Sequence, residues 1–260
     1  MPRTSAYKDS VNIAAVERAL KVMEVICYEE REMGVNEIAS KMGDYPSTIY
    51  RVIATLVAHG YLYQNPESNK YGLNYKVVML GKNVEENSTL IRISKPYADA
   101  LAAEFKENVN VGIREDEEYW ANTIYQAKGG KRTLSVSESV GQAYRCYYSS
   151  IGKALLAFSE DLDYSLLRTE RIEQYTPNTI TDPEKMIEEL ETIRKQGYAI
   201  DNEEQELGLY CIGCPVLDHK GHAVLALSIS GYERNIKAHG VERIISSLKA
   251  ACEEMSRFFQ

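Results

Sequence analysis

The sequence contains no apolar run that approaches the roughly 20 residues needed for a membrane-spanning helix. Its first ten residues, MPRTSAYKDS, lack the apolar core of a secretory signal peptide. Cysteine is also scarce. The five cysteines are scattered along the chain and odd in number, which does not suit a disulfide framework. These absences predict a cytoplasmic protein with reduced thiols and no membrane partner.

Motifs of the common enzyme classes are absent as well. The sequence has no nucleotide-binding glycine loop, no metalloprotease motif and no nucleophile elbow. Its four histidines fall where turns and helix ends are expected, and none stands at a recognised motif spacing. The composition is otherwise that of an ordinary globular protein, with 44% hydrophobic and 26% charged residues. We therefore expect a binding protein that needs no cofactor, and not an enzyme.

Positive charge is in short supply, which limits any nucleic-acid-binding function. The chain holds 30 Lys and Arg against 38 Asp and Glu, a net charge of −8. Residues 1–80 contain nine side chains of each sign, so the acidic excess lies in residues 81–260, which hold 21 basic and 29 acidic side chains. Binding of DNA by this neutral first part would depend on local placement of Arg51, Lys70 and Lys76 and on doubling by dimerisation.

Residues 35–73 hold the most informative pattern in the chain. Apolar residues recur at i, i+3, i+4 and i+7 from Val35 to Met42 and again from Ile49 to Leu56, which predicts two amphipathic helices. A Gly-Asp pair separates them, and Gly60 ends the second. Two short strands, Tyr61–Tyr63 and Lys70–Leu73, are expected to follow as a hairpin. Two helices joined by a tight turn and followed by a hairpin describe a winged helix-turn-helix.

The polar face of the second helix is the candidate DNA-reading surface. Hydroxyl, phenol and guanidinium groups suit phosphates and base edges. The residues predicted to contact DNA are Ser47, Thr48, Tyr50, Arg51 and Thr55 on the helix, with Asn69 and Lys70 on the wing. The alternative is a small helical domain whose polar helix face is only solvated, and spacing alone does not decide between the two. The hairpin favours the DNA-binding interpretation.

A linker helix and a second domain are expected after the wing. Residues 76–88 predict the linker helix, interrupted or bent at Gly81, and Pro96 should kink or divide the next helix, which reaches Glu107. The apolar stripes around Val77–Val84 and Leu90–Phe105 are candidate dimer surfaces. From Asn108 the apolar period changes to two. Strands are expected at Asn108–Ile113, Tyr119–Gln126, Thr133–Ser137, Leu209–Val216 and Ala223–Ser230, and helices at Lys153–Phe158, Asp182–Gln196 and Val241–Phe259.

Six segments in order form a further pattern: VERALKVMEVI (16–26), EIASKMGDYPSTIYRVIATLVAHGYL (37–62), SSIGKALLAF (149–158), TPNTITD (176–182), IRKQGYAIDNEEQELGLYCIGCPV (193–216) and ALSISGYERNI (226–236). With these segments the chain resembles, over nearly its whole length, the IclR family of bacterial transcription regulators. The resemblance implies an α+β chain with a winged helix-turn-helix domain at 1–75, a linker helix at 76–88 and a GAF/PAS-like effector domain at 89–260. The last domain should have a mixed sheet and flanking helices.

The resemblance also implies a function and a ligand site. Members of the family are homodimers or homotetramers that bind palindromic operators and respond to a small metabolite. We expect a repressor of a catabolic operon that is controlled by a small carboxylate. The effector-binding residues implied by the resemblance are Ser150, Ile151, Asp201, Leu209, Cys211, Ser228 and Ser230. The identity of the metabolite and the operator sequence do not follow from the residues.

Alternation along residues 223–230 supports that pocket independently. Ser228 and Ser230 share one face of an apolar strand, which is typical of a cavity that needs hydrogen-bond donors. Serines that face water or bond the backbone would give the same pattern. A run of tyrosines, Tyr144, Tyr147 and Tyr148, near the pocket turn would suit a hydroxylated ligand.

The Cys211-x-x-Cys214 pair supports a competing interpretation as a metal or thiol sensor, or as an enzyme that uses Cys211. It is a single pair without a second one, which is a weak signal for zinc. In an extended strand the two positions point to opposite faces, so they would not share a metal. We therefore expect no metal site.

Overall fold

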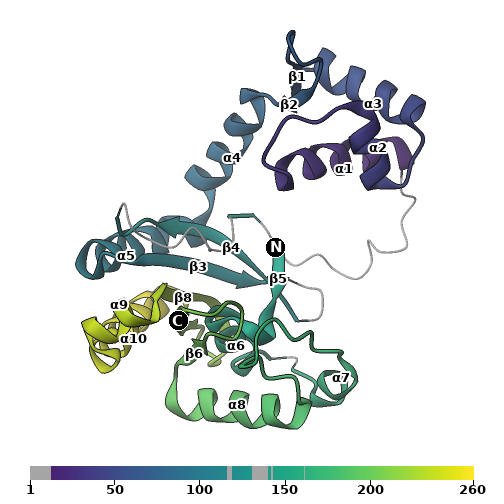
Figure 1. Cartoon of the computed structure of the whole chain (residues 1–260). Coiled ribbons are helices and arrows are strands. Elements are labelled where there is room, and N and C mark those ends of the chain that lie inside the picture. The colour runs from purple at the N-terminus through teal and green to yellow at the C-terminus, as the bar shows by residue number, and fades with distance from the viewer. Residues whose placement is uncertain (1–12, 116–118, 131–139, 142, 161) are drawn as a thin grey trace. The chain divides into compact units, whose positions relative to one another are not determined.

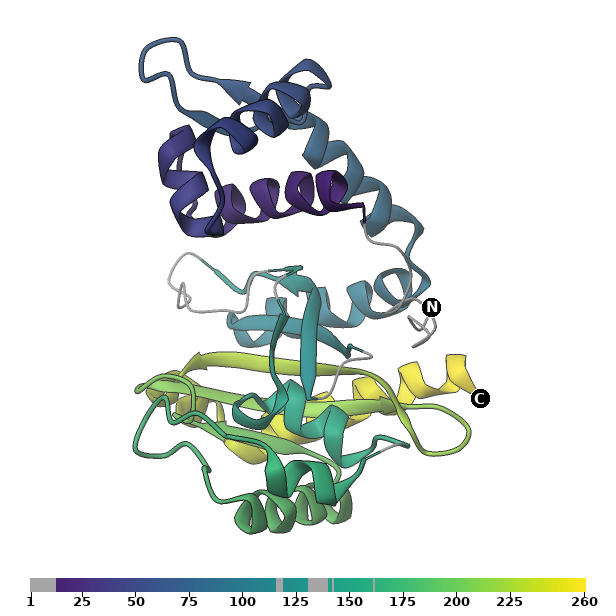
Figure 2. The same ribbon diagram turned by 90° about the vertical axis from the view of Figure 1, so that its right-hand side faces the viewer.

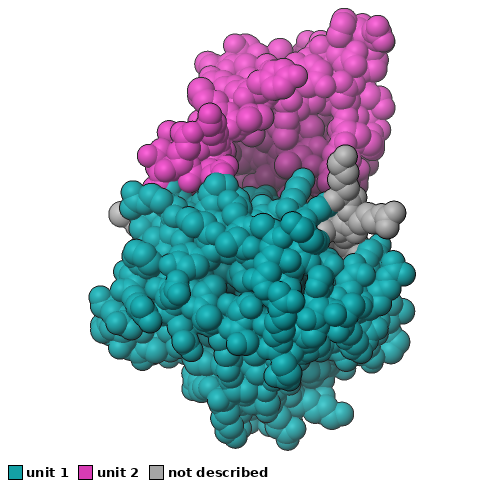
Figure 3. All heavy atoms as spheres, turned by 90° about the vertical axis from the view of Figure 1, so that its left-hand side faces the viewer, with its two compact units in different colours: residues 1–2, 88–260 teal, residues 3–87 magenta. Residues whose placement is uncertain are grey.

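The computed structural model describes residues 13–115, 119–130, 140–141, 143–160 and 162–260. The chain divides into two compact units, one that ends at Asn87 and one that spans Ser88–Gln260 (Figures 1 and 3). The linker helix belongs to the first of these units.

The first unit contains the predicted helix-turn-helix and wing. Its elements are α1 (Ala14–Tyr28), α2 (Val35–Met42), α3 (Pro46–Ala58), β1 (Leu62–Gln64), β2 (Tyr71–Leu73) and α4 (Tyr75–Asn87). Both strands begin one residue later than predicted, and they pair antiparallel with Leu62 opposite Leu73. An isolated antiparallel bridge extends the wing, because Met33 and Tyr71 exchange two backbone hydrogen bonds.

Apolar periodicity explains why these helices pack together. Ile38, Ile49 and Ile53 are fully buried and form a core with α1. The turn between α2 and α3 requires the left-handed backbone of Gly43, whose φ is 63°. Burial of each such side chain contributes about 1.5–3 kcal/mol to stability. Because the apolar face of α3 is held in the core, its polar face points outward.

Helix α4 runs without interruption through Gly81, so of the two alternatives predicted at that residue, an interruption or a bend, the interruption is wrong. A glycine in a helix interior costs only about 1 kcal/mol relative to alanine, which is too little to break a helix of 13 residues. No residue of α4 is buried, and Leu80 and Val84 are 44% and 63% exposed. The helix therefore presents an apolar surface that no other described residue of its own unit covers.

The second unit is built on a six-stranded sheet with helices on both faces. Its elements are α5 (Thr89–Phe105), β3 (Asn108–Arg114), β4 (Trp120–Ala127), β5 (Ala143–Arg145), η2 (Cys146–Tyr148), α6 (Ser150–Ala157), α7 (Tyr164–Thr169), α8 (Pro183–Gln196), β6 (Ala199–Asn202), β7 (Leu209–Leu217), β8 (Ala223–Tyr232), α9 (Glu233–His239), α10 (Val241–Ser256) and η3 (Arg257–Phe259). The predicted strand Thr133–Ser137 lies outside the described residues. The α+β class is confirmed.

The strand order is β5-β4-β3-β8-β7-β6, and every described pair is antiparallel. The mixed sheet expected from the sequence is therefore wrong in this detail. Helices α5 and α10 cover one face, and α6 and α8 lie on the other (Figures 1 and 2). On the face covered by α6 and α8, the polar residues of β8 meet the start of α6.

Helix α5 also continues through its proline, so Pro96 does not divide it. Pro96 is exposed, and the carbonyl that its missing N–H leaves free is that of Arg92, also exposed, where water can bond it. The buried residues of α5, among them Ala98 and Phe105, pack on the sheet of their own unit. This apolar stripe is therefore used within the chain, whereas the one on α4 is uncovered.

Candidate functional site

The polar face of α3 is open to solvent. Ser47, Tyr50, Arg51 and Thr55 are exposed, and Thr48 is half-buried. The Thr55 hydroxyl donates to the Arg51 carbonyl at 2.9 Å, and in the described part of the chain the Arg51 guanidinium forms no hydrogen bond or ion pair. Helix α3 thus presents the donors and acceptors predicted for it on one continuous side.

The two predicted wing residues differ in their surroundings. Asn69 occupies the left-handed region with φ 56°, which is favoured at a turn, and its carbonyl accepts from Gln64. The Lys70 ammonium lies 3.6 Å from Glu37 Oε2 at the start of α2. Lys76, expected to place positive charge near DNA, instead donates to the carbonyl of His59 at the end of α3.

Glu32, in the loop between α1 and α2, holds the wing in place and was not predicted from the sequence. Its carboxylate accepts hydrogen bonds from Tyr63 Oη at 2.7 Å, from Asn65 Nδ2 and from Ser68 Oγ at 3.1 Å. The bond from Tyr63, followed by that from Asn65, lowers the pKa of Glu32. Three side chains of the hairpin thus converge on one acceptor in the α1–α2 loop. Because Glu32 is 31 to 36 residues away from them in the sequence, no local pattern indicates the contact.

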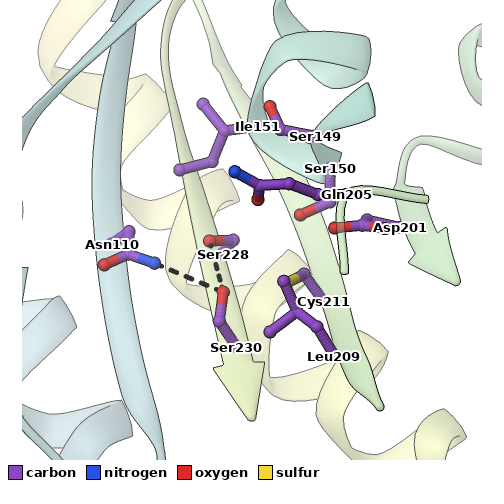
Figure 4. Close-up of a pocket in the computed structure, with 10 residues that line it drawn as sticks. All are labelled: Asn110, Ser149, Ser150, Ile151, Asp201, Gln205, Leu209, Cys211, Ser228 and Ser230. Carbon is purple, nitrogen blue, oxygen red and sulfur yellow. Dashed lines mark hydrogen bonds between the residues drawn. The ribbon is translucent and has the colours of Figure 1, made fainter. Parts of the chain in front are cut away.

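A pocket of about 300 Å³, including space open to solvent, lies between the start of α6 and the ends of β7 and β8 (Figure 4). All seven residues predicted to bind an effector line it together. Its lining consists of Asn110, Ser149, Ser150, Ile151, Asp201, Gln205, Leu209, Cys211, Ser228 and Ser230. Asn110, Ser149 and Gln205 are not among the effector-binding residues predicted from the sequence. Polar Asn108 and Asn110 at alternate positions of an apolar strand were the available signal for the first of these.

Hydroxyl and amide groups form one side of the pocket. Ser228 Oγ and Ser230 Oγ lie 3.3 Å apart, and Asn110 Nδ2 donates to Ser230 Oγ at 3.2 Å (Figure 4). Gln126 Nε2 in turn donates to Asn110 Oδ1 at 2.7 Å. The serines are 2% and 9% exposed, so the alternative in which they face water is excluded. These groups can donate to ligand oxygens because hydroxyls rotate.

The first turn of α6 forms a second side. Ser149 caps the helix by accepting from the N–H of Gly152 at 2.9 Å. The N-terminus of a helix carries partial positive charge and N–H groups without helical partners, which suits an anion. The backbone of α6 lies close against β7 because residue 213 is glycine: a Cβ on Gly213 would lie 2.7 Å from the Ser150 carbonyl.

Asp201 is the acidic member of the lining and is 1% exposed. It lies opposite Cys211 in the β6–β7 ladder, and its Oδ1 accepts from the backbone N–H of Glu204 at 2.8 Å. Burial and, next, the nearby charge of Glu204 raise the pKa of Asp201 to about 7. A carboxyl group that titrates near neutrality can either accept or donate a hydrogen bond to a ligand.

The tyrosines near the pocket turn do not line it. Tyr144, Tyr147 and Tyr148 are buried in the core between the sheet and α6. Tyr148 packs edge-on against Tyr147 and against Tyr175, with ring centroids 5.5 and 4.8 Å away. Their number therefore reflects packing and gives no support to a hydroxylated ligand.

The two cysteines of the CxxC pair face opposite sides of the sheet, as strand geometry predicts. Cys211 lines the pocket, while Cys214 lies in the core under α10, where Cys252 Sγ donates to its carbonyl. Burial raises the pKa of Cys214 to about 12, so its thiol stays protonated. Among the described residues there is no group of three or more His, Cys, Asp or Glu that could hold a metal ion.

Two family models match this chain in order. The IclR helix-turn-helix domain matches residues 15–66, and the C-terminal domain of the bacterial transcriptional regulator IclR matches residues 83–257. The chain belongs to the IclR family. It is a DNA-binding transcriptional regulator and not an enzyme, and the relatives it matches over most of their length are named as such regulators.

Relatives of this IclR-family regulator cover almost the whole chain. It is 32% identical over 258 residues to the HTH-type transcriptional regulator KdgR of Escherichia coli (strain K12), which covers 98% of this chain and 96% of that protein. It is 29% identical over 231 residues to the transcriptional repressor IclR of the same organism, with 88% and 84% covered.

Solved structures of the family share the fold. An IclR transcriptional regulator from Alicyclobacillus acidocaldarius superposes with a TM-score of 0.85 at 24% identity, covering 96% of this chain and 100% of that one. An IclR homologue from Microbacterium hydrocarbonoxydans, crystallised in complex with 4-hydroxybenzoate, superposes with a TM-score of 0.78 at 20% identity, with 94% and 99% covered. In the described part of this chain, no helix is both long and apolar enough to cross a membrane.

Proposed function

We propose that this IclR-family regulator is a cytoplasmic, ligand-responsive repressor of a catabolic operon, controlled by a small carboxylate that binds in the Ser228–Ser230 pocket. The observation that carries the proposal is the convergence of seven residues from separate segments, named from the sequence, on one polar pocket. The second unit is then a GAF-like effector domain. The name of the Escherichia coli repressor supports repression, and the 4-hydroxybenzoate complex supports a carboxylate.

On DNA, α3 enters the major groove and the wing follows the backbone. Arg51 reads a base edge or a phosphate, while Ser47, Thr48, Tyr50 and Thr55 add polar contacts from the same helix. Asn69 and Lys70 act from the wing. The exposed polar face of α3 supports these roles.

Assembly supplies the affinity that a neutral first unit lacks. A homodimer, alone or paired into a homotetramer, places two winged helices on the two half-sites of a palindromic operator. The exposed apolar residues of α4 support the proposal that this helix forms the surface through which two chains associate. The Arg51 and Lys70 side chains of both subunits then neutralise phosphates on one DNA duplex.

The ligand fits by its carboxylate. The N–H groups at the start of α6 and the two serine hydroxyls donate to the carboxylate oxygens, and Leu209 and Cys211 supply the apolar wall. Binding changes operator affinity only through the difference between the ligand's affinities for the DNA-binding and the released conformations.

The test replaces both pocket serines by alanine and measures binding of the natural carboxylate, identified by a thermal-shift screen. Each lost hydrogen bond to a buried ligand oxygen should cost about 1–3 kcal/mol of affinity. The exposed serine of α10, in Ser246→Ala, is the matched control and should change nothing. DNA binding without ligand should survive in all variants. A double variant that responds at the wild-type ligand concentration would place the ligand elsewhere.

A further inference from the structure

Lys153 lies in α6, directly beyond the pocket turn, and its side chain is completely buried. Its Nζ lies 2.5 Å from Glu204 Oε1 in the β6–β7 loop and 3.3 Å from Glu189 Oε1 in α8. The side chain of Glu204 is 6% exposed, whereas that of Glu189 is 30% exposed. A buried ammonium therefore joins two helices to the loop that borders the pocket.

That loop, residues 203–208, carries the pocket residue Gln205 and is held from a second direction. The hydroxyls of Thr176 and Thr179 donate to backbone carbonyls at the start of the loop, both at 2.6 Å. Both threonines belong to the TPNTITD segment, which takes no direct part in the pocket lining. The loop is thus fixed through its backbone by these threonines and through the side chain of Glu204 by α6.

Asp201 is the third carboxylate of this buried cluster. Within the described residues, the ionisable groups around it are Glu204 of the loop, Lys153 of α6, Glu189 of α8, which shares Lys153, and Cys211 of β7. Glu204 contacts Asp201 through its backbone N–H and contacts Lys153 through its carboxylate. One ammonium therefore serves three carboxylates, and its shortest contact is with Glu204.

Among the described residues, Asp201 has no cation within ion-pair distance. Burial alone would lower the pKa of Lys153, but the charges of Glu204 and Glu189 raise it, so the ammonium remains charged. Burial raises the pKa of Glu204, and the ammonium at 2.5 Å opposes this by favouring the carboxylate. A buried carboxyl without a counter-charge takes up a proton in preference to remaining ionised.

We propose that Glu204, held by Lys153, is a positioning residue that keeps a proton on Asp201, so that Asp201 donates a hydrogen bond to an anionic ligand. The proposal deepens the proposed function, because it rests on this pocket being the effector site. It names the recognised group as a carboxylate oxygen, and it makes Asp201 a donor alongside the serines. An ionised Asp201 would repel the same ligand at hydrogen-bond distance.

The sign of the pH dependence follows from this assignment. Below about pH 7, the pKa of Asp201, the residue is protonated and the anion binds at full strength. Above that value binding must add a proton, so the association constant should fall by up to about tenfold per pH unit. Removing the charge of Glu204 removes an effect that raises the pKa of Asp201, and the fall should then begin at lower pH.

Infrared titration of the ligand-free, full-length protein tests the proposal. The wild-type protein should show a carboxylic-acid carbonyl band that disappears with a midpoint near pH 7, and Asp201→Asn should abolish it. Glu204→Gln keeps the size of the side chain and should move the midpoint to lower pH. Glu206→Gln, which makes the same charge change in the same loop, should leave the midpoint unchanged.

Two results would overturn the proposal. A neutral-pH band that survives in Asp201→Asn but is lost in Glu204→Gln would place the proton on Glu204. A midpoint unchanged in Glu204→Gln would remove Glu204 from any role in setting it. Circular dichroism and thermal melting establish that each variant is folded before it is titrated.

A ligand titration separates this proposal from the proposed function. With 4-hydroxybenzoate as the carboxylate probe, wild-type affinity should fall above about pH 7, whereas Asp201→Asn, an amide that donates at every pH, should bind with constant affinity. Equal pH profiles for the two proteins would contradict the donor role of Asp201. A wild-type protein that binds no 4-hydroxybenzoate would count against the ligand class of the proposed function, while the ligand-free titration still decides the proton's position.

Discussion

At the scale of single residues, position decides what each charge does. Arg51 projects from an exposed helix face, where a guanidinium remains available to an external partner. Lys153 carries the same sign of charge but is enclosed by two carboxylates and serves the interior. The net charge of the chain is therefore a poor guide to DNA binding, because the position of each cation decides whether it can contact DNA.

Arg51→Ala should weaken binding to the DNA upstream of the regulated operon by about 1–3 kcal/mol, because a bidentate contact to a base edge is lost. Fluorescence anisotropy with labelled DNA measures this change. Arg92→Ala, an exposed arginine of α5, is the matched control and should retain wild-type affinity. Equal affinities for wild type and Arg51→Ala would remove α3 from the reading role.

The buried lysine also marks the limit of prediction at this scale. Its two carboxylate partners lie 36 and 51 residues away in the chain, and no local periodicity connects them. The alternation of Ser228 and Ser230, in contrast, is a local pattern that strand geometry converts directly into a shared face. Residues whose surroundings are set by their own element could be predicted, and those set by distant loops could not.

At the scale of elements, length determined what the sequence revealed. Helices α2, α3 and α8 and strands β7 and β8 carry enough apolar repeats to be recognised, and their bounds differ from the expected ones by two residues or fewer. Strand β5 has three residues and β6 has four, too few to show a period. Strands β1 and β2 are as short, but the turn residues between them indicated a hairpin. The predicted interruption at Gly81 failed because one helical glycine costs only about 1 kcal/mol, and the division at Pro96 failed because water can bond the carbonyl that the proline leaves free.

The wing gives a prediction at this scale. Glu32→Ala removes the acceptor shared by Tyr63, Asn65 and Ser68, so the hairpin should lose its fixed geometry and DNA affinity should fall several-fold. The sign is informative, because removing a surface carboxylate near DNA would otherwise strengthen binding. Anisotropy at low and moderate salt, with Glu30→Ala as the control in the same loop, measures the effect. Stronger binding by Glu32→Ala would show that Glu32 acts only as a charge.

At the scale of the whole molecule, α4 is one of the helices with an uncovered apolar surface. Its Leu80 and Val84 are exposed one turn apart, while the comparable residues of α5 are covered by their own sheet. Exposed apolar patches of this kind are typical of association surfaces. Dimerisation through α4 would also bring two neutral DNA-binding units onto one operator.

Leu80→Glu combined with Val84→Glu should therefore convert the oligomer to a monomer and abolish tight DNA binding together. Lys82 lies on the opposite side of α4. Lys82→Glu changes the net charge as much as the double substitution does, and it should leave assembly intact. Light scattering at the concentrations used for DNA binding reports the mass. A wild-type protein that is monomeric under those conditions would refute the assembly.

The central claim, that a ligand in the pocket controls DNA binding, is tested most directly by measuring operator affinity with and without saturating carboxylate ligand. The wild-type protein should change its DNA affinity by a factor of roughly 5–150, and DNA should change ligand affinity by the same factor. The Ser228→Ala, Ser230→Ala double variant should bind DNA like the wild type without ligand and show no change at that ligand concentration. A wild-type protein that binds ligand and DNA with full, independent affinities would contradict the account.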